Sequence, residues 1–179
     1  MDMTNEVLKT MQTRRSCRRY QDRKPDPEAL QAVLEAGTWA PTGMGRQSPV
    51  IVVVQDPETI RRLSAMNAAV MGHDGDPFYG APCVAIVLAD KRIPTYEADG
   101  SLVMGNLLNA AESVGLASCW INRAREVFDT EEGKELLRRW NVPNADYLVG
   151  IGNCLLGYAA EGGTKEPAPR KQDYIVYVR

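Results

Sequence analysis

The segment from Ser101 to Gly115 restricts the possible folds of this chain most strongly, because it is apolar almost all round. A helix with such a wide apolar surface has to be covered on more than one side. The cover can come from a sheet of the same chain or from a partner subunit, so we expect this helix to be the spine of the domain. The Asp99–Gly100 pair predicts a turn immediately before it. The small and polar residues that interrupt the apolar surface are Gly105, Asn106, Asn109, Glu112 and Ser113.

Further helices are predicted where a capping residue precedes apolar residues at helical spacing. Asp26 and Asp56 each stand before a proline at the first helical position. Thr4 and Thr130 could cap two more helices. The helices expected in this way cover about residues 4–11, 27–38, 57–66 and 130–140.

Four apolar runs predict strands, at residues 49–54, 83–89, 116–121 and 147–156. The first two runs are typical of strands that are buried on both faces. The glycines of the fourth run indicate close approach of another backbone segment. Together, helices and strands predict one α+β or α/β domain over residues 1–179 with a mainly central sheet.

The carboxy-terminal segment, residues 158–179, is expected to be an arm that ends in a strand. Glycine and proline remove any periodicity as far as Asp173, whereas Tyr174–Val178 has the composition of a strand. A terminal strand at the end of a long arm needs a sheet edge to pair with. That edge could belong to a second subunit.

Charge and hydropathy exclude several classes of function. The net charge is -2 and the pI is near 5.5, which argues against nucleic acid as the main partner. The amino terminus lacks the pattern of a secretory signal, and the chain has no apolar stretch of about 18 residues. We therefore expect a cytoplasmic protein with no membrane association.

No metal site is expected. The four cysteines are far apart in sequence, and three of them lie in apolar runs as small buried residues. Flanking arginines would favour the thiolate of Cys17, so its reactivity stays open. The only histidine, His73, lies in a loop at 72–82 with too few ligand residues at metal-binding spacing. That loop could border an active site or pack as ordinary surface.

The stretch Thr13–Tyr20 carries four arginines within eight residues. Guanidinium groups that are kept together repel one another, so a fold that gathers them offers them an anion such as phosphate. Ser16 adds a neutral hydroxyl donor to the same stretch. The alternative interpretation is a solvated basic stripe on the surface.

Several separate motifs, taken together, resemble the FMN-dependent nitroreductase family over about residues 8–178. The motifs lie in the family's order, at Arg14–Arg18, Ala40–Gln47, Gly115–Ile121 and Pro169–Lys171. The resemblance implies an α+β fold with a central, mainly antiparallel sheet flanked by helices. It also implies a homodimer with FMN at the subunit interface and a carboxy-terminal arm strand exchanged between subunits.

The resemblance also assigns the cofactor-binding residues. The phosphate and ribityl chain of FMN would be held by the cluster Arg14, Arg15, Ser16 and Arg18, with Arg170 closing the site. A loop from the other subunit would approach the flavin with Pro41, Thr42, Gly43, Met44 and Gln47. One face of the ring would lie along Cys119, Trp120, Ile121, Asn122 and Arg123. Asn67 would read the polar edge of the pyrimidine ring.

The chain departs from the family at Gly45, where many members carry asparagine, and at Ser48–Pro49, where many carry Pro-Trp. Loss of the asparagine removes a polar contact and opens space, which affects the expected substrate preference more than flavin binding. A fingerprint of the form Gly-x-Gly-x-x-Gly is missing, so a nicotinamide nucleotide would visit the open flavin face only transiently.

The activity implied is ping-pong hydride transfer from NADH or NADPH through FMN to a nitroaromatic, quinone or similar small acceptor. No catalytic side chain is required, because hydride transfer to FMN N5 needs neither a nucleophile nor an obligatory acid. Arg123 could stabilise the reduced flavin or could be a solvated arginine. Rival hypotheses are a flavoprotein that catalyses dehalogenation or flavin fragmentation, and a non-enzymatic domain that binds a phosphate or a partner. The sequence leaves open the physiological acceptor and the choice between NADH and NADPH.

Overall fold

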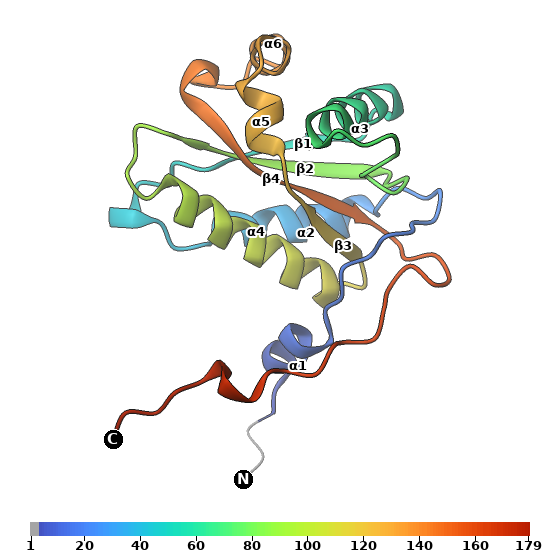
Figure 1. Ribbon diagram of the computed structural model, residues 1–179, viewed down its shortest axis with the longest axis vertical. Coiled ribbons are helices and arrows are strands. Elements are labelled where there is room, and N and C mark those ends of the chain that lie inside the picture. The colour runs from blue at the N-terminus through green and yellow to red at the C-terminus, as the bar shows by residue number, and fades with distance from the viewer. Residues whose placement is uncertain (1–3) are drawn as a thin grey trace.

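The computed structural model describes residues 4–179 of the protein as three layers, with a central sheet between two groups of helices (Figure 1). The strands are β1 (Val50–Val54), β2 (Cys83–Asp90), β3 (Ala117–Ile121) and β4 (Leu148–Gly157). The helices are α1 (Glu6–Thr13), α2 (Pro27–Thr38), α3 (Pro57–Met71), α4 (Tyr96–Ser113), α5 (Ala124–Asp129) and α6 (Glu131–Arg139). Single 3₁₀ turns lie at Gly43–Gly45, Ala145–Tyr147 and Gln172–Tyr174.

The sheet has the strand order β1-β2-β4-β3, and every neighbouring pair is antiparallel. This confirms the α+β fold with a central antiparallel sheet. The central strand β2 is buried along almost its whole length, as predicted. Strand β1 is only half-buried, and Val53 is 38% exposed, so the prediction of a strand buried on both faces was wrong there. The reason is that β1 is an edge strand.

Alternate residues of the sheet supply two separate cores. Val84, Ile86 and Leu88 of β2 belong to the core beneath α3, α5 and α6. Ala85 and Val87 of the same strand belong to the core shared with α2 and α4. Two helical layers therefore cover the two faces of one sheet, as Figure 1 shows.

Helix α4 covers the sheet with only one of its faces. Val103, Met104, Leu107 and Ala111 are buried, whereas Leu102 is 47% exposed. Helices α2 and α1 also pack on α4, but the face that carries Leu102 is exposed within the described part of this chain, and its cover by a partner subunit stays a prediction.

The predicted turn at Asp99–Gly100 was wrong, because α4 begins at Tyr96 and includes both residues. Each residue has a packing reason to lie in the helix. The Asp99 carboxylate accepts a hydrogen bond from the Gly43 backbone 2.9 Å away. A Cβ at Gly100 would lie 2.4 Å from Ile151, so no larger residue fits there without a shift.

The predicted helix starts are mostly confirmed. Helices α2 and α3 begin at their prolines, and Thr130 caps α6 by accepting a bond from the Gly133 backbone at 3.0 Å. Helix α1 is capped by Asn5 and not by Thr4, since the Asn5 side chain accepts from the Leu8 backbone at 3.0 Å. The short helix α5 was not predicted, because six residues carry too little periodicity.

The four cysteines belong to the two cores of the domain. All four cysteines are buried, and the Cys17 thiol donates to the Arg19 carbonyl 3.1 Å away. Residues 4–179 contain no group of three or more histidine, cysteine or acidic side chains that could hold a metal ion. Within the same range, no helix combines the length and apolar character needed to cross a membrane.

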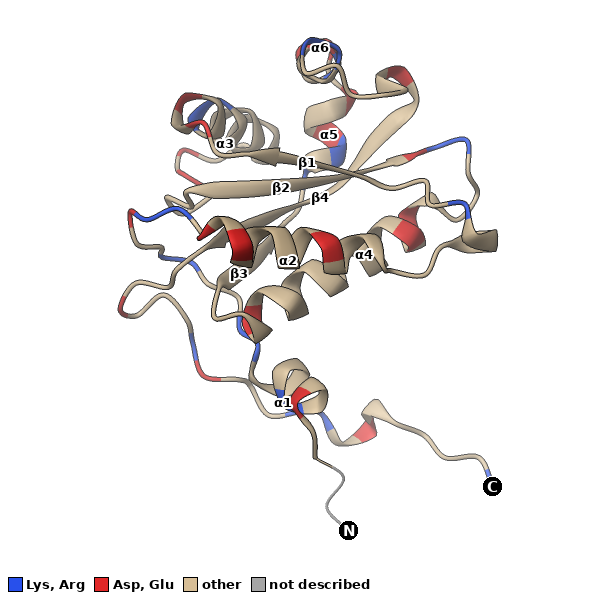
Figure 2. Ribbon diagram, turned by 180° about the vertical axis from the view of Figure 1, so that it is seen from behind, with Lys and Arg blue, Asp and Glu red and all other residues tan. Residues whose placement is uncertain are grey.

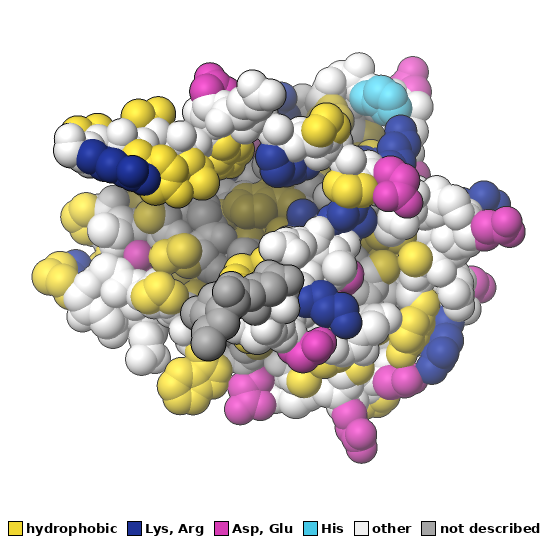
Figure 3. All heavy atoms as spheres, turned by 90° about the horizontal axis from the view of Figure 1, so that it is seen from below, with side chains coloured by type: hydrophobic (Ala, Val, Ile, Leu, Met, Phe, Trp, Pro, Cys, Tyr) yellow, Lys and Arg dark blue, Asp and Glu magenta, His cyan; other side chains and the backbone are white. Residues whose placement is uncertain are grey.

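The arm and α1 project from the layer that contains α4 (Figures 1 and 2). The arm's end does not pair with the sheet of its own chain, and residues 175–178 are between 67% and 96% exposed. Its exchange with a second subunit stays a prediction. The face from which α1 and the arm project carries hydrophobic side chains around a central hollow (Figure 3).

Candidate functional site

The arginine cluster is fastened to the free edge of β3. Ser16 forms a parallel bridge with Ser118, and the Cys17 backbone donates to the Ser118 carbonyl at 2.9 Å. On the other side, the Arg18 backbone donates to the Gly163 carbonyl at 2.7 Å. The cluster is therefore held between the start of β3 and the start of the arm. Figure 2 shows basic residues along this segment between α1 and α2.

Three of the predicted phosphate ligands converge on Cys119. Burial raises the pKa of the Cys119 thiol, whereas Arg18, a hydrogen bond with Ser16, and Arg14 act on that pKa in the opposite direction. Together with the backbone bridge from Ser16 to Ser118, these influences place Arg14, Ser16 and Arg18 in the neighbourhood of Cys119. The structure thus gathers residues from two predicted motifs that are about a hundred positions apart in sequence.

The two converging arginines carry charge without a carboxylate partner. Among the described residues, Arg14 and Arg18 form no ion pair. The arginines that do form ion pairs are Arg23, Arg62, Arg92, Arg123, Arg125, Arg138 and Arg139. Two unpaired guanidiniums beside a hydroxyl are a donor set for an anion.

Arg15 is placed differently from its neighbours. Its guanidinium donates to the carbonyl oxygens of Gln12 at 2.7 Å and Arg14 at 2.8 Å. These carbonyls belong to the carboxy-terminal end of α1, which a cation stabilises. The structure therefore gives Arg15 a helix-capping contact and does not bring it to Cys119.

The segment after Cys119 borders a cleft of about 540 Å³. Trp120 lies over Gly152, where a Cβ would come within 2.4 Å of the indole nitrogen. That nitrogen is buried and has no hydrogen-bond partner within the part of the chain that the structure describes. Ile121 is half-buried and packs against the core beneath α3 and α5. The cleft is lined by Glu97, Ser101, Trp120, Asn122, Arg123, Arg125, Glu126, Gly150 and Ile151.

Arg123 has a strained backbone and an ion-pair partner. Its backbone has φ 74°, a left-handed conformation that costs a residue with a Cβ about 1–2 kcal/mol. Its guanidinium donates to Glu126 at 2.7 Å, which lowers the pKa of that carboxyl. Arg123 is therefore a half-exposed arginine with a partner, at the rim of the cleft.

The predicted loop Pro41–Gln47 lies at the opposite edge of the sheet, between α2 and β1. It is held by Asp99 through the Gly43 backbone, and the Gln47 backbone donates to the Thr42 hydroxyl at 3.0 Å. Met44 has φ 55° and is 80% exposed. Thr42 and Gln47 line a second cleft, of about 620 Å³, between α2 and β1.

Two sheet edges thus carry the predicted site residues within one chain. Four strands set about 4.8 Å apart separate the edges by about 14 Å. The arginine cluster also lies near the carboxy-terminal end of α4, where Arg15 and Glu112 line one cleft. The loop is anchored at Asp99, near the amino-terminal end of this helix, and Asp99 lies 13 residues before Glu112, about 20 Å away along the axis. A single chain does not bring the two groups together.

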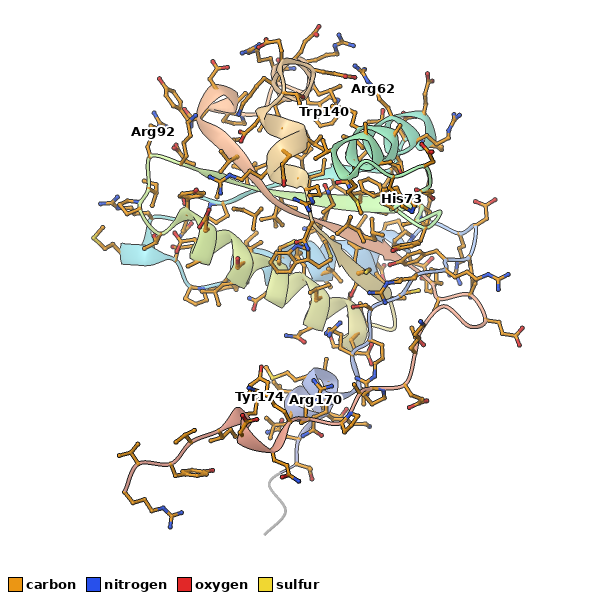
Figure 4. All side chains as sticks on the ribbon, in the orientation of Figure 1. Arg62, His73, Arg92, Trp140, Arg170 and Tyr174 are labelled. Atoms are coloured by element: carbon orange, nitrogen blue, oxygen red, sulfur yellow. The ribbon has the colours of Figure 1, made fainter. Side chains whose placement is uncertain are left out.

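Two further predicted residues lie on other elements, α3 and the arm. Asn67 has no exposed surface, and its amide oxygen accepts from Asn153 at 3.4 Å between α3 and β4. Arg170 lies on the exposed arm, where its guanidinium donates to the Ala168 carbonyl at 2.5 Å (Figure 4).

Sequence reasoning missed Asp99, Glu97 and Arg125. Asp99 is 2% exposed and accepts bonds from both the loop and the Thr95 hydroxyl, so it fixes the loop. Glu97 and Arg125 form an ion pair across the cleft. The signal would have been the acidic residues in the first turn of α4, but the sequence prediction began this helix at Ser101 and not at Tyr96.

Comparison with known proteins agrees with the family resemblance seen in the sequence. The sequence matches the Nitroreductase family over residues 11–158. A solved nitroreductase with bound FMN from Bacteroides fragilis is 31% identical, with a TM-score of 0.88 over 98% of this chain and 100% of that one. A solved nitroreductase with bound FMN from Desulfitobacterium hafniense is 30% identical, with a TM-score of 0.87 over 99% and 100%.

A curated relative, FMN reductase [NAD(P)H] of Bacillus subtilis, is 25% identical over 91% of this chain and 70% of its own length. The family match covers most of the chain, and it spans the arginine cluster, the loop and β3 alike. On these findings, the protein belongs to the Nitroreductase family.

Proposed function

We propose that this protein is an FMN-dependent NAD(P)H oxidoreductase that acts as a homodimer on nitroaromatic, quinone or similar small acceptors. The observation that carries the proposal is the group of Arg14, Ser16 and Arg18 on the free edge of β3, two of them cations without an ion-pair partner. The family's solved members with bound FMN support the same assignment.

The residues at the β3 edge fit FMN. A phosphate monoester carries between about 1.5 and 2 negative charges, which suits two guanidiniums and a hydroxyl. The Trp120 indole nitrogen and the Ser118 hydroxyl are buried without a partner among residues 4–179, so the edge has donors to spare. We therefore assign the phosphate to Arg14, Ser16 and Arg18, and one ring face to the segment from Trp120 to Arg123.

Bound FMN would supply hydride chemistry, which protein side chains lack. The chain's own residues would bind FMN, orient it and shield it from water. Trp120 and Ile121 give the segment apolar surface, while Asn122 and Arg123 bring polar groups to the rim of the cleft. No side chain has to act as a nucleophile. The nicotinamide nucleotide and the acceptor would use the same open face in turn, as a ping-pong cycle requires.

The homodimer is proposed because the two groups of site residues occupy opposite sheet edges of one chain. A second copy can bring its own Pro41–Gln47 loop to the β3 edge of the first. The uncovered face of α4, the half-buried edge strand β1 and the exposed arm would be buried in the same step. Residues 174–178 would pair with an edge such as β1 of the other copy, and Arg170 would approach the phosphate site with its arm.

The test is the visible spectrum of the purified protein without oxygen, before and after addition of NADH or NADPH, with the molar mass in solution. We expect a flavin spectrum that bleaches and a mass of twice the chain. A flavin spectrum that stays oxidised would contradict the reductase activity and favour another flavin reaction. A protein that stays colourless after FMN is supplied would support the alternative interpretation of the arginines as a solvated surface stripe.

A further inference from the structure

A cleft of about 530 Å³ lies between α3, the loop at 72–82 and the segment that follows the arginine cluster. Its volume falls within the usual range for small-molecule sites. All of its lining residues belong to one chain, and none of them is among the residues assigned to FMN above. The cleft is therefore a candidate site for a further ligand of this protein.

One wall of the cleft is the loop at 72–82, which a single carboxylate holds in shape. Asp76 accepts a hydrogen bond from the Ser64 hydroxyl of α3. It also accepts from the Phe78 backbone at 2.9 Å and from the Gly80 backbone at 2.6 Å. These donors compensate the Asp76 charge and fix the loop against α3. The wall therefore exists before any ligand binds.

The floor of the cleft is apolar. Ile60, Phe78 and Ala81 line the cleft and are buried in the core beneath α3. Ala65 lines it from the exposed side of the same helix. An apolar ligand body can cover this surface without separating a polar group from its partner, so its burial there is favourable. The floor therefore favours a ligand with an aromatic or aliphatic body.

Two cations stand at one end of the cleft. Lys24 and Arg61 line it, and neither forms an ion pair within residues 4–179. Both act on Asp56, whose pKa is lowered first by its hydrogen bonds with Thr59 and further by these two charges. Lys24 and Arg61 therefore lie near the same point, at the start of α3. Asp56 is engaged as the cap of that helix, since it accepts from the Thr59 backbone at 2.8 Å and from its hydroxyl at 2.6 Å.

We propose that this cleft binds a small aromatic carboxylate. Its carboxylate group lies between Lys24 and Arg61, and its ring covers the apolar floor beside Phe78. Such a molecule needs a pair of free cations next to a buried apolar surface, and the cleft supplies both. These residues take no part in the proposed function, so this proposal can be tested independently of the reductase activity.

Asp22 favours a carboxylate over a phosphate as the ligand's anionic group. It lines the cleft, and its carboxylate has no ion-pair partner in the part of the chain that the structure describes. Its charge opposes a phosphate monoester, with nearly two negative charges, more strongly than a carboxylate with one. Two cations and one carboxylate leave one positive charge, which a carboxylate ligand neutralises. Removing the Asp22 charge should therefore strengthen binding.

The experiment measures binding of 2-naphthoate by isothermal titration calorimetry, with FMN supplied to the protein and with uncharged 2-naphthamide as a probe of the same shape. We expect the acid to bind about tenfold more tightly than the amide. Lys24→Met/Arg61→Met should remove that difference, because two exposed charge contacts together amount to about tenfold in affinity. Asp22→Asn should strengthen binding of the acid about twofold. Equal affinity of acid and amide for the wild-type protein, or no binding of either, would overturn the proposal.

The matched control is Arg62→Met, compared with Arg61→Met. Arg62 is the next residue of α3, but it is directed toward α6 and pairs with Glu132 at 2.8 Å (Figure 4). Arg61→Met should weaken binding of 2-naphthoate about threefold, and Arg62→Met should leave it unchanged. Equal losses in the two variants would reduce the effect to the general charge of α3 and overturn the assignment.

A space-filling variant and the flavin spectrum locate the ligand. Ala65→Trp puts a large side chain into the cleft from the exposed side of α3 and should abolish binding of 2-naphthoate. A probe in this cleft should leave the visible spectrum of bound FMN unchanged, whereas a probe stacked on the flavin ring would shift it. A shifted spectrum together with binding that persists in Ala65→Trp would place the probe on the flavin and overturn this proposal. Failure of the protein to oxidise either nicotinamide nucleotide would instead defeat only the reductase proposal.

Discussion

The β3 edge and the β1 edge of the sheet are built in opposite ways. At β3, a parallel bridge between Ser16 and Ser118 joins two distant segments of one chain, and the donors around Cys119 are in place. At β1, the loop that carries Met44 is held in shape by Asp99 but faces solvent. One edge gathers two unpaired arginines and a hydroxyl within a single chain, whereas the other presents an exposed loop.

Each edge should therefore control a different property of the protein. Residues of the β3 edge should set the affinity for FMN, because their guanidiniums are unpaired and close together. Residues of the β1 edge and of the outer face of α4 should set assembly, because their apolar groups are exposed in one chain. Variants can test whether these two properties separate.

The largest effect is expected from the double variant Arg14→Met/Arg18→Met. Two charge-assisted contacts of about 1.5–3 kcal/mol each correspond to a loss of roughly a thousandfold in FMN affinity. Titration of the FMN-free protein with FMN, followed by flavin fluorescence, measures it. Arg15→Met is the matched control and should change the affinity only a few-fold, because Arg15 contacts carbonyls of α1. Equal losses in both variants would contradict the division of roles within the cluster.

The next effect concerns assembly. Leu102→Glu places a charge on the uncovered face of α4, and burial of an unpaired carboxylate costs several kcal/mol. We expect the dimer to weaken by roughly a hundredfold, as measured by sedimentation at several concentrations. Val70→Glu on α3 changes a residue of similar exposure, 37% against 47%, on the other side of the sheet. It should leave the dimer intact. Equal dissociation of both variants would contradict the assignment of the interface to the α4 face.

Much of the fold followed from local patterns. Proline at the first helical position located α2 and α3, and the apolar run at 83–89 located the fully buried strand β2. The same reasoning failed at β1, whose run of Val and Ile looks like a central strand. Position in the sheet is decided by pairing with distant strands, and a composition pattern does not contain that information.

Only those parts of the candidate site that carry a sequence motif could be predicted. The cluster at Arg14–Arg18 and the segment after Cys119 were found separately, and their contact depends on a tertiary bridge. The different role of Arg15 could not be foreseen, because it follows from where α1 ends. Asp99 was interpreted as a turn residue, since aspartate before glycine is a common turn signal that tertiary contacts here override.

A smaller effect is expected at the anchor of the loop. Asp99→Ala removes a buried acceptor of two hydrogen bonds, from the Gly43 backbone and the Thr95 hydroxyl. The loss should lower the free energy of unfolding by about 1–3 kcal/mol, as measured by urea denaturation. FMN affinity should fall as well if the loop completes the site of the other subunit. A destabilised variant with unchanged FMN affinity would confine the loop to a structural role.

The smallest effect should come from Arg123, where backbone strain and an exposed ion pair oppose each other. Arg123→Gly relieves the left-handed conformation, a gain of about 1 kcal/mol, and loses a pair with Glu126 that is worth at most about 0.5 kcal/mol. Arg123→Ala loses the same pair and keeps the strain. We therefore expect the glycine variant to be more stable than the alanine variant by about 1 kcal/mol in urea denaturation. Turnover measures the effect of the charge separately from that of the strain, because both variants remove the guanidinium and only the alanine variant keeps the strained backbone. Equal slowing in both would make Arg123 a cation that acts on the bound flavin, whereas unchanged turnover in both would leave it as a solvated, paired arginine at the rim of the cleft.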